Sequence, residues 1–298
     1  MISVVIPTHN RASMLDETLS HVYEQKDIQF EVIVLNDNED PDDTDLVVGK
    51  YKDIRYIKSK KIDGAIAKRK YGLSIARGEY LYTTDDDDYL IDPYFLCKAK
   101  KILDEDSTLS FVSGNTILMY ENADASERYM EENKLSISGR QNQWEYLASI
   151  HTCKPISIAP TLFRKSAFEK IPQNEILEIG DTCLYLLALL DGDAYIMDDV
   201  VSTYRIRTDS VSNNWPYEYV ILGLKQRKIV YERAKKFMPN PLNFYANQTI
   251  SLYVHYKRSC PSYIEKMKVL LWLLANNCGS FKIIKFSIRY ILKEIIRP

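Results

Sequence analysis

Short apolar segments of strand type alternate with segments of helical period at the start of this chain. The strand-type segments are ISVVIP, FEVIVL, IRYI and EYLYT, at residues 2–7, 30–35, 54–57 and 79–83. Between them, Leu15 and Leu19 recur on one helical face, and residues 64–78 are typical of a helix that ends at Gly78. Strands separated by helices need crossover connections, so the pattern predicts an α/β fold with a mainly parallel sheet and flanking helices.

The rest of the chain changes character twice. From about residue 142 to 205 the pattern is mixed, with strands expected near 157–163 and 200–205 and an apolar helix from Asp181. After Trp215 the sequence is helical in character, and turn-forming residues interrupt it at 238–241, 259–262 and 278–280. We therefore expect a helical C-terminal extension after the α/β part.

Composition limits the class of protein and its surroundings. The 298 residues, 46% hydrophobic and 27% charged, suit one large domain or a domain with a helical appendage. The five cysteines lack CxxC spacing, so we expect neither disulfides nor a zinc site, and a cytoplasmic location. No long apolar run or basic leader occurs, so neither a membrane span nor a secretion signal is expected. No nucleic-acid partner is expected, although the net charge of −2 conceals an uneven distribution of charge along the chain.

Positive charge is concentrated at the C-terminal end, where residues 257–298 contain nine Lys and Arg against two Glu. Within 280–298, basic residues recur on one helical face and isoleucines on another: Lys282, Lys285, Arg289 and Lys293, against Ile284, Ile288, Ile291 and Ile295. Such a helix either lies in an anionic membrane interface or packs its apolar face on the α/β part or on a second subunit of a homodimer.

Residues 83–90, TTDDDDYL, place adjacent carboxylates at the end of an expected strand. Carboxylates this close repel one another, so a cation is expected among them, although an acidic run can also be a solvated turn. The spacing of Asp85 and Asp87 allows both to approach one Mg²⁺ or Mn²⁺ ion that keeps positions open for phosphate oxygens. Asn36 and Asp37 follow the second strand, and ligands of parallel sheets bind at the carboxyl ends of strands.

Five segments in order resemble the successive motifs of family-2 glycosyltransferases with the GT-A fold. They are VVIPTHNR at 4–11, EVIVLND at 31–37, AKRKYGLSIARGEYLYTTDDDD at 67–88, GDTCLYLLALLDG at 180–192 and YRIRTDSVS at 204–212. The resemblance implies a GT-A catalytic domain over 1–212, with a donor half at 1–120 and an acceptor half at 121–212, before the extension at 213–298. It also implies inverting transfer of a sugar from a nucleotide-diphosphate donor.

The resemblance assigns residues to the donor site. Those implied to line the nucleotide crevice are Pro7, Thr8 and Asn10. Asp37 corresponds to the residue that binds the base, usually uracil, and Arg69 to an arginine beside the base or the diphosphate. Asn36 stands where an aspartate is more common in the family, and Lys70 where an asparagine is.

The family's DxD motif matches Asp85 and Asp87, with Asp87 the metal ligand and Asp85 a ligand of the metal or the ribose. Asp86 is a further residue implied to contact the donor. Because Asp86 and Asp88 are also aspartates, the motif could equally be aligned one residue later in the chain. Alternating residues of a strand share a face, so Arg205 and Arg207 could both approach the diphosphate, or pair with nearby acids such as Asp198. The family often has histidine where Arg207 stands.

Inversion needs a base that removes a proton from the acceptor hydroxyl, and a carboxylate suffices for this. Asp181 occupies the aspartate position of the family's ED motif, with Gly180 in place of the glutamate. Asp181 also precedes an apolar helix and would be a good N-cap, and the two roles are compatible. Glu178 is the alternative base.

The acceptor implied by the resemblance is a hydroxyl of a glycan or lipid-linked glycan in polysaccharide or oligosaccharide biosynthesis, on the inner face of the membrane. Two alternatives remain. A sugar-phosphate nucleotidyltransferase would need a Gly-rich loop after the first strand, where this chain has PTHNR. An inactive sugar-binding protein on the same fold is favoured by Gly180, and disfavoured by the intact acidic run and Asp181.

Overall fold

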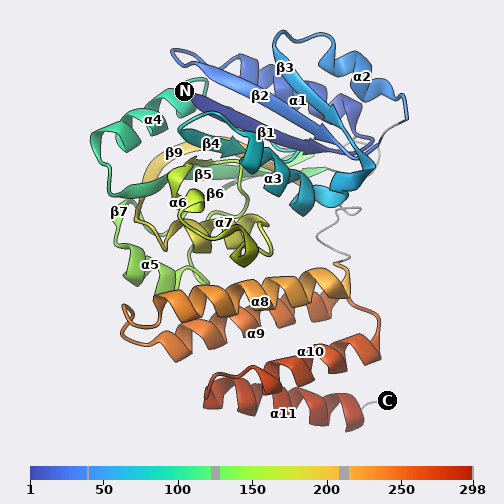
Figure 1. Cartoon of the computed structure of the whole chain (residues 1–298), viewed down its shortest axis with the longest axis vertical. Coiled ribbons are helices and arrows are strands. Elements are labelled where there is room, and N and C mark those ends of the chain that lie inside the picture. The colour runs from blue at the N-terminus through green and yellow to red at the C-terminus, as the bar shows by residue number, and fades with distance from the viewer. Residues whose placement is uncertain (39, 122–127, 208–214, 297–298) are drawn as a thin grey trace. The chain divides into compact units, whose positions relative to one another are not determined.

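The computed structural model describes residues 1–38, 40–121, 128–207 and 215–296 (Figure 1). The chain divides into two compact units. An α/β unit comprises residues 1–143, 153–171 and 179–207, and a helical unit comprises 144–152, 172–178 and the chain after 207. The domain boundary expected at 212–213 lies outside the described residues.

A nine-stranded sheet forms the centre of the α/β unit within the described ranges, in the order β3-β2-β1-β4-β8-β5-β9-β7, with β6 paired to β5. The strands are β1 Ile2–Thr8, β2 Phe30–Asn36, β3 Ile54–Lys58, β4 Tyr80–Thr83, β5 Leu109–Glu121, β6 Arg128–Asn133, β7 Gly139–Gln141, β8 Thr161–Arg164 and β9 Asp193–Ile206. β1 to β4 are mutually parallel, as are β5 and β9, while β8 runs antiparallel between β4 and β5. The predicted α/β fold is confirmed.

Helices cover both faces of this sheet. Those assigned to the α/β unit are α1 Ala12–Tyr23, α2 Asp43–Val48, α3 Gly64–Ile75, α4 Phe95–Glu105, α6 Ser166–Glu169 and α7 Asp181–Ala188, together with the 3₁₀ turn Lys60–Ile62. Val4 and Ile6 of β1 share a buried cluster with Leu15 of α1 and Phe95 of α4. The opposite face of β1, at Val5, packs against α3. Because both faces are covered, β1 is a continuous apolar run rather than an alternating one.

The helix expected over 64–78 is shorter than predicted, because α3 ends at Ile75 with Ala76 as its C-cap. Gly78 has a different purpose: a Cβ at this position would lie 2.5 Å from the backbone nitrogen of Ser3. The Gly78 N–H donates to the Ser3 hydroxyl at 2.8 Å. The glycine therefore permits close approach of the chain to the start of β1 rather than ending a helix.

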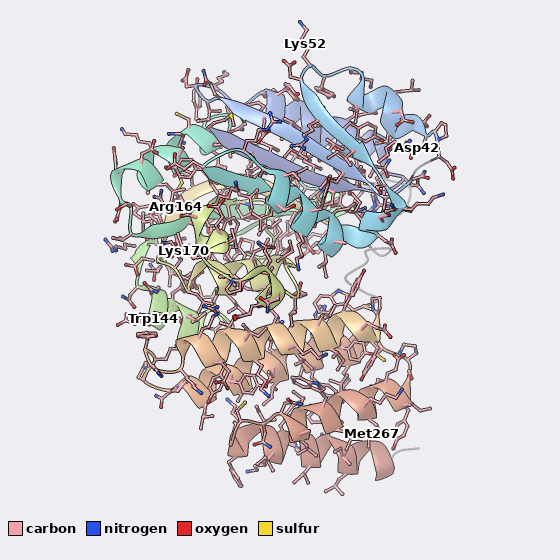
Figure 2. The ribbon with its side chains drawn as sticks, in the orientation of Figure 1. Asp42, Lys52, Trp144, Arg164, Lys170 and Met267 are labelled. Atoms are coloured by element: carbon pink, nitrogen blue, oxygen red, sulfur yellow. The ribbon has the colours of Figure 1, made fainter. Side chains whose placement is uncertain are left out.

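Two strands also differ from the sequence-based expectation. The segment expected at 157–163 is extended only over Thr161–Arg164, and the segment at 200–205 is the end of the longer β9. Arg164, labelled in Figure 2, donates to the carbonyls of Leu103 and Leu109 at 2.6 and 3.0 Å. This guanidinium therefore fixes β8 to the end of α4 and the start of β5.

The helical unit contains the long helices α8 Tyr217–Ala234, α9 Pro241–Ser259, α10 Tyr263–Ala275 and α11 Phe281–Ile296. Most of α5 Gln143–Ser149 and the 3₁₀ turn Gln173–Glu175 also belong to it. The breaks between the long helices fall where turn-forming residues were expected. α8 packs on α9, and both α10 and α11 contact α9 and each other. Within the described ranges, every helix is too short or too polar to traverse a bilayer.

Candidate functional site

The acidic run follows β4 directly and forms a turn in which buried and accessible carboxylates alternate. Asp86 and Asp88 are only 4% and 1% exposed, whereas the side chains of Asp85 and Asp87 are 36% and 18% exposed. The two carboxylates that a ligand could reach are therefore those of Asp85 and Asp87. This is the register in which the DxD motif was aligned.

The inward carboxylates are held by the protein. Asp86 accepts a hydrogen bond from the Thr8 hydroxyl at 2.8 Å, and Asp88 accepts one from the Arg205 backbone N–H at 3.0 Å. The Thr18 hydroxyl lies 3.0 and 3.1 Å from the carbonyls of Asp86 and Asp88. Burial raises the pKa of Asp86, and burial together with the charge of Asp87 raises that of Asp88 well above its usual range. Asp86, which was assigned as a donor contact, is thus buried against β1.

The residues after the run are paired to β9. The Thr203 N–H donates to the Tyr89 carbonyl at 2.8 Å, Leu90 forms an antiparallel bridge with Ser202, and the Ile91 N–H donates to Val201 at 2.8 Å. β4 holds the other end of the run in the sheet. The turn is therefore fixed on both sides by backbone hydrogen bonds.

A guanidinium group contacts each accessible carboxylate. Arg69 of α3 lies 2.5 Å from Asp85 through Nη2 and 3.1 Å from Asp181 through Nη1. Arg11, just before α1, lies 2.8 Å from Asp87 and 3.2 Å from Asp86 through the same Nη1. Burial, followed by the charges of Asp85 and Asp86, raises the pKa of Asp87 to about 6, although Arg11 opposes this.

Asp181 is the first residue of α7, and the N-cap is Gly180. The N-cap expectation is therefore wrong by one residue, and no side chain caps this helix in the described contacts. The Asp181 carboxylate still lies in the first turn, where the helix dipole favours negative charge. The alternative base, Glu178, is 8% exposed in the helical unit, where its N–H donates to Gln226 at 3.2 Å.

Residues at the ends of β1 and β2 form a second polar cluster. Asp37 is 2.9 Å from Lys68 and 2.6 Å from the His9 imidazole, and it accepts the Gly64 N–H at 2.9 Å. Lys68 also donates to the Thr8 carbonyl at 2.7 Å. Burial raises the pKa of Asp37, but the hydrogen bonds from Lys68 and Gly64 outweigh it and hold that pKa below its usual value.

The other residues assigned to the donor crevice differ in exposure. Pro7 is buried within β1, while Asn10 is exposed with a positive φ of 52°, a conformation that asparagine tolerates. The Asn10 side chain accepts from Asn38 at 2.9 Å. Asn36 is fully buried and donates to the Tyr56 hydroxyl at 3.0 Å, so it supports the β2–β3 edge.

The two arginines at the end of β9 have different partners. Arg205 has a 4% exposed side chain and pairs with Glu17 at 2.6 Å and Glu121 at 3.2 Å, rather than with Asp198. Arg207 follows the end of β9, with Nη1 3.0 Å from the sulfur of Met14. Arg205 therefore joins α1 to β5 and β9 as a structural cation.

The accessible carboxylates suit a hard divalent cation, because both offer oxygen donors and a separation of one residue. Across the described parts of the chain, however, no group of three or more His, Cys, Asp or Glu side chains is arranged to hold a metal ion. Mg²⁺ and Mn²⁺ commonly complete their coordination with substrate phosphates and water. Asp85 and Asp87 can therefore supply two oxygen ligands to such an ion, which leaves its other positions to water and phosphate oxygens.

Sequence reasoning missed two cations of this site, Arg11 and Lys68. Both are adjacent to residues that were singled out, Arg11 next to Asn10 and Lys68 next to Arg69. Asp87, the partner of Arg11, lies 76 positions later in the chain, and Asp37, the partner of Lys68, lies 31 positions earlier. Local patterns carry no signal for such pairs.

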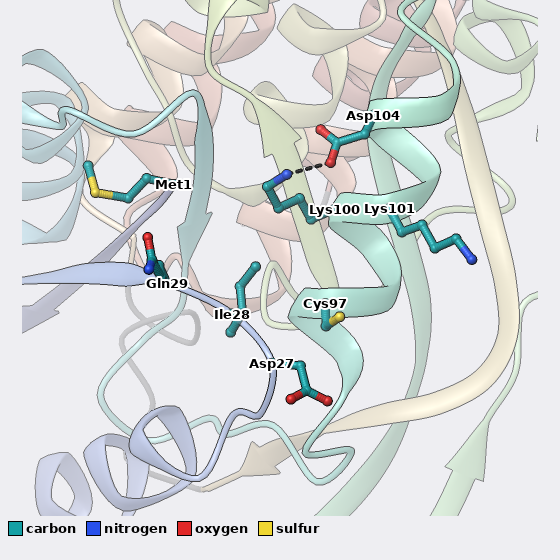
Figure 3. A pocket seen from close by; sticks show the side chains of 8 residues that line it. All are labelled: Met1, Asp27, Ile28, Gln29, Cys97, Lys100, Lys101 and Asp104. Atoms are coloured by element: carbon teal, nitrogen blue, oxygen red, sulfur yellow. Dashed lines mark hydrogen bonds and ion pairs between the residues drawn. The ribbon is translucent and has the colours of Figure 1, made fainter.

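A cavity of about 530 Å³ lies elsewhere on the α/β unit (Figure 3). Its lining residues are Met1, Asp27, Ile28, Gln29, Cys97, Lys100, Lys101 and Asp104. Met1 precedes β1 and Gln29 precedes β2, so the cavity borders the amino ends of these strands, opposite the acidic run. No residue assigned to the donor or catalytic site lines it.

Comparison with solved structures identifies the class of fold. Staphylococcus aureus TarS in complex with UDP-GlcNAc matches with a TM-score of 0.56 at 17% identity, over 97% of this chain and 91% of that chain. The mannosyltransferase PcManGT of Pyrobaculum calidifontis, solved with GDP-Man and Mn²⁺, matches with a TM-score of 0.52 at 17% identity, over 100% of this chain and 81% of that chain. The α/β unit with its C-terminal helices therefore has the GT-A fold of these glycosyltransferases.

Sequence comparison gives the family. The model of glycosyl transferase family 2 matches residues 3–171, and this chain belongs to that family. A Campylobacter jejuni protein named GalNAc(5)-diNAcBac-PP-undecaprenol beta-1,3-glucosyltransferase is 25% identical over 285 residues, 93% of this chain and 84% of its own length. The chain spans 34% to 39% of the length of the Rickettsia glycosyltransferases that it also matches.

Proposed function

We propose that this chain is an inverting, metal-dependent glycosyltransferase that transfers a sugar from a nucleotide-diphosphate donor, a UDP-sugar, to a hydroxyl group. The observation that carries the proposal is the Arg69 bridge. Its two terminal nitrogens lie 2.5 Å from Asp85 and 3.1 Å from Asp181. Arg69 thus brings the expected base next to the expected donor site, although the two acids are distant in sequence.

The donor would occupy the carboxyl ends of β1, β2 and β4. Asp37 is the residue proposed to bind uracil, and its contacts with Lys68 and Gly64 fix the direction of the carboxylate. Asp85 and Asp87 would hold Mg²⁺ or Mn²⁺ together with the diphosphate, and the metal when bound would neutralise the charge of the leaving group. Arg69 is close enough to Asp85 to face the same diphosphate.

Asp181 is proposed to accept the proton of the acceptor hydroxyl as that oxygen attacks the anomeric carbon. Its place in the first turn of α7 and its contact with Arg69 restrict the carboxylate to one direction. A base held in this way needs no rearrangement before it receives the proton. Glu178 remains the alternative base.

The acceptor is proposed to be a glycan or a lipid-linked glycan. The Campylobacter relative supports this, because its name places its own acceptor on a diphosphate-linked undecaprenol. Such an acceptor implies peripheral contact with the inner face of the membrane through α11. Among the described side chains of α11, the exposed large apolar ones are Phe281, Ile288 and Leu292. Ile288 is the exposed member of the predicted isoleucine face, whereas Ile284 and Ile291 are partly buried.

Membrane contact is testable through charge. Lys285 and Arg289 are exposed on α11, so replacing both with Glu should abolish cosedimentation with vesicles that contain anionic lipid. Lys52→Glu, at an exposed position before β3 (Figure 2), is the control for a single charge reversal outside α11. Equal sedimentation of all three proteins would contradict the membrane proposal and leave the glycosyltransferase proposal unaffected.

The enzymatic proposal is tested by donor turnover. Purified protein should release UDP slowly from one UDP-sugar by hydrolysis, faster with acceptor, and not at all in excess EDTA. Arg69→Gln should reduce turnover strongly, because it removes the cation between Asp85 and Asp181. If no nucleotide sugar is turned over and no nucleotide binds in the presence of Mn²⁺, the proposed glycosyltransferase function is wrong.

A further inference from the structure

We infer that Arg11 is a built-in counter-cation of the acidic run, which occupies the Asp87 carboxylate until a divalent cation replaces it. The inference rests on the proposed function, because it concerns the metal that Asp85 and Asp87 are proposed to hold. Its basis is the position of one nitrogen atom. Arg11 Nη1 lies 2.8 Å from Asp87 and 3.2 Å from Asp86.

The contact is partly removed from solvent. The side chain of Arg11 is 28% exposed, and those of Asp87 and Asp86 are 18% and 6% exposed. Charge–charge interactions at such a site are screened much less than on an open surface. The guanidinium is protonated at every accessible pH, so it is a permanent positive charge within the run.

This charge competes with a metal ion. A divalent cation that approaches Asp87 meets the guanidinium already bound to that carboxylate, and the two cations repel one another. Asp85 is contacted in the same way by Arg69. The chain alone therefore resists a metal at this turn, whereas a nucleotide diphosphate brings negative charge that favours its entry. Metal and nucleotide would consequently strengthen each other's binding.

The geometry also provides a place for Arg11 after release. Because the same Nη1 contacts both acids, loss of the Asp87 contact leaves the contact with Asp86. Asp86 itself is fixed by the Thr8 hydroxyl at 2.8 Å, and its backbone carbonyl by Thr18 at 3.0 Å. Asp86 thus acts as the anchor of Arg11, and Asp87 as the exchangeable partner.

The experiment compares Arg11→Gln with wild type by calorimetric titration with MnCl₂ at pH 8 without nucleotide, and by Tm with and without Mn²⁺. The variant should bind Mn²⁺ about tenfold more tightly, the factor expected when one partly buried ion pair no longer has to be broken. Its Tm without metal should be lower than that of wild type, and Mn²⁺ should raise it by more. Arg11→Lys, which keeps a point charge, should be intermediate and serves if Arg11→Gln does not fold.

Arg140→Gln is the matched control. Arg140 also bridges two carboxylates, at 2.9 Å from Asp106 and 2.8 Å from Asp193. Asp193 is the first residue of β9, whereas the residues after the acidic run pair near the other end of that strand. This variant should lower Tm without changing Mn²⁺ binding. Suppose that wild type and both Arg11 variants bind Mn²⁺ in the presence of UDP, but that neither variant binds Mn²⁺ alone more tightly than wild type does. The inference is then wrong and the proposed function stands. Failure of wild type to bind Mn²⁺ with UDP would refute the metal site itself.

Discussion

Removing one partner of the buried pair of Asp37 and Lys68 should destabilise the α/β unit by several kcal/mol. The side chains are 7% and 3% exposed, and the ion pair distance is 2.9 Å. Coulomb's law at an effective dielectric constant of about 20 gives an attraction of roughly 6 kcal/mol at this distance. Removing one partner of such a pair typically destabilises a protein by about 3–5 kcal/mol, because the other charge remains buried.

Asp37→Asn is the variant that isolates this effect. The amide has the same shape and can still accept the Gly64 N–H, but it leaves Lys68 without a countercharge. We expect a loss of about 3–5 kcal/mol, and recovery of most of it when Lys68→Met is added. His9→Ala is the control, because the His9 side chain is 59% exposed and its contact with Asp37 should contribute less than about 1 kcal/mol.

The assay has to follow the α/β unit itself. The tryptophans, Trp144, Trp215 and Trp272, all belong to the helical unit, so their fluorescence would report on the wrong part of the chain. Hydrogen exchange of peptides from β1 and β2 measures the local opening free energy where the pair lies. A loss below about 1 kcal/mol in Asp37→Asn, or no recovery in the double variant, would refute the reasoning.

The same pair has a pH dependence of defined sign. The pKa of Asp37 is lower in the folded protein than in the unfolded chain, where it is about 3.9. Its stabilising contribution is therefore complete above the unfolded-state pKa and is lost as the pH falls through the folded-state pKa. The difference in opening free energy between wild type and Asp37→Asn should be constant from pH 6 to 8 and shrink in acid.

Other variants separate the roles of the site residues. Asp181→Asn should keep donor affinity and lose turnover by roughly 100- to 10,000-fold, because an amide cannot accept the proton; a parallel loss of donor affinity would favour Glu178. Asp87→Ala should lose metal-dependent UDP binding without a fall in Tm, because it relieves like-charge repulsion; full activity in EDTA would contradict this. Gly72→Ala should destabilise the α/β unit by about 1–3 kcal/mol, since its Cβ would lie 2.3 Å from Val5 Cγ1; an unchanged Tm would show that α3 can shift.

The parts of the fold that the sequence predicts well are those with a local signal. β1 and β2 are continuous apolar runs, and their ends were predicted to within a residue. β5 was missed, although it is one of the longest strands, because Ser110, Asn115 and Thr116 interrupt its apolar pattern. These polar groups are buried and paired with β9 or the residues beside it, for example Ser110 with the Gly192 carbonyl at 3.0 Å. A single sequence shows their polarity but not their partners.

The candidate site likewise has features that a local sequence pattern predicts and features that depend on distant residues. The acidic run could be located because four aspartates in a row after a strand are a local pattern. Which of them reach solvent could not be predicted, because that depends on Thr8, Arg11 and Arg205, which contact the run from β1, the start of α1 and β9. The N-cap of α7 was displaced by one residue, because both Gly180 and Asp181 are acceptable in that position and only backbone dihedrals distinguish them.

Because the acidic turn is held by backbone pairing on both sides, the path of this segment does not depend on the side chains that it carries. β4 before the run, and Tyr89 to Ile91 after it, are held by main-chain hydrogen bonds that do not depend on which side chains stand between them. Replacing Asp85 or Asp87 should therefore leave the path of the chain unchanged. At the metal site that we propose, histidine or cysteine in place of these two aspartates would offer nitrogen or sulfur to softer metals, while the backbone keeps its path.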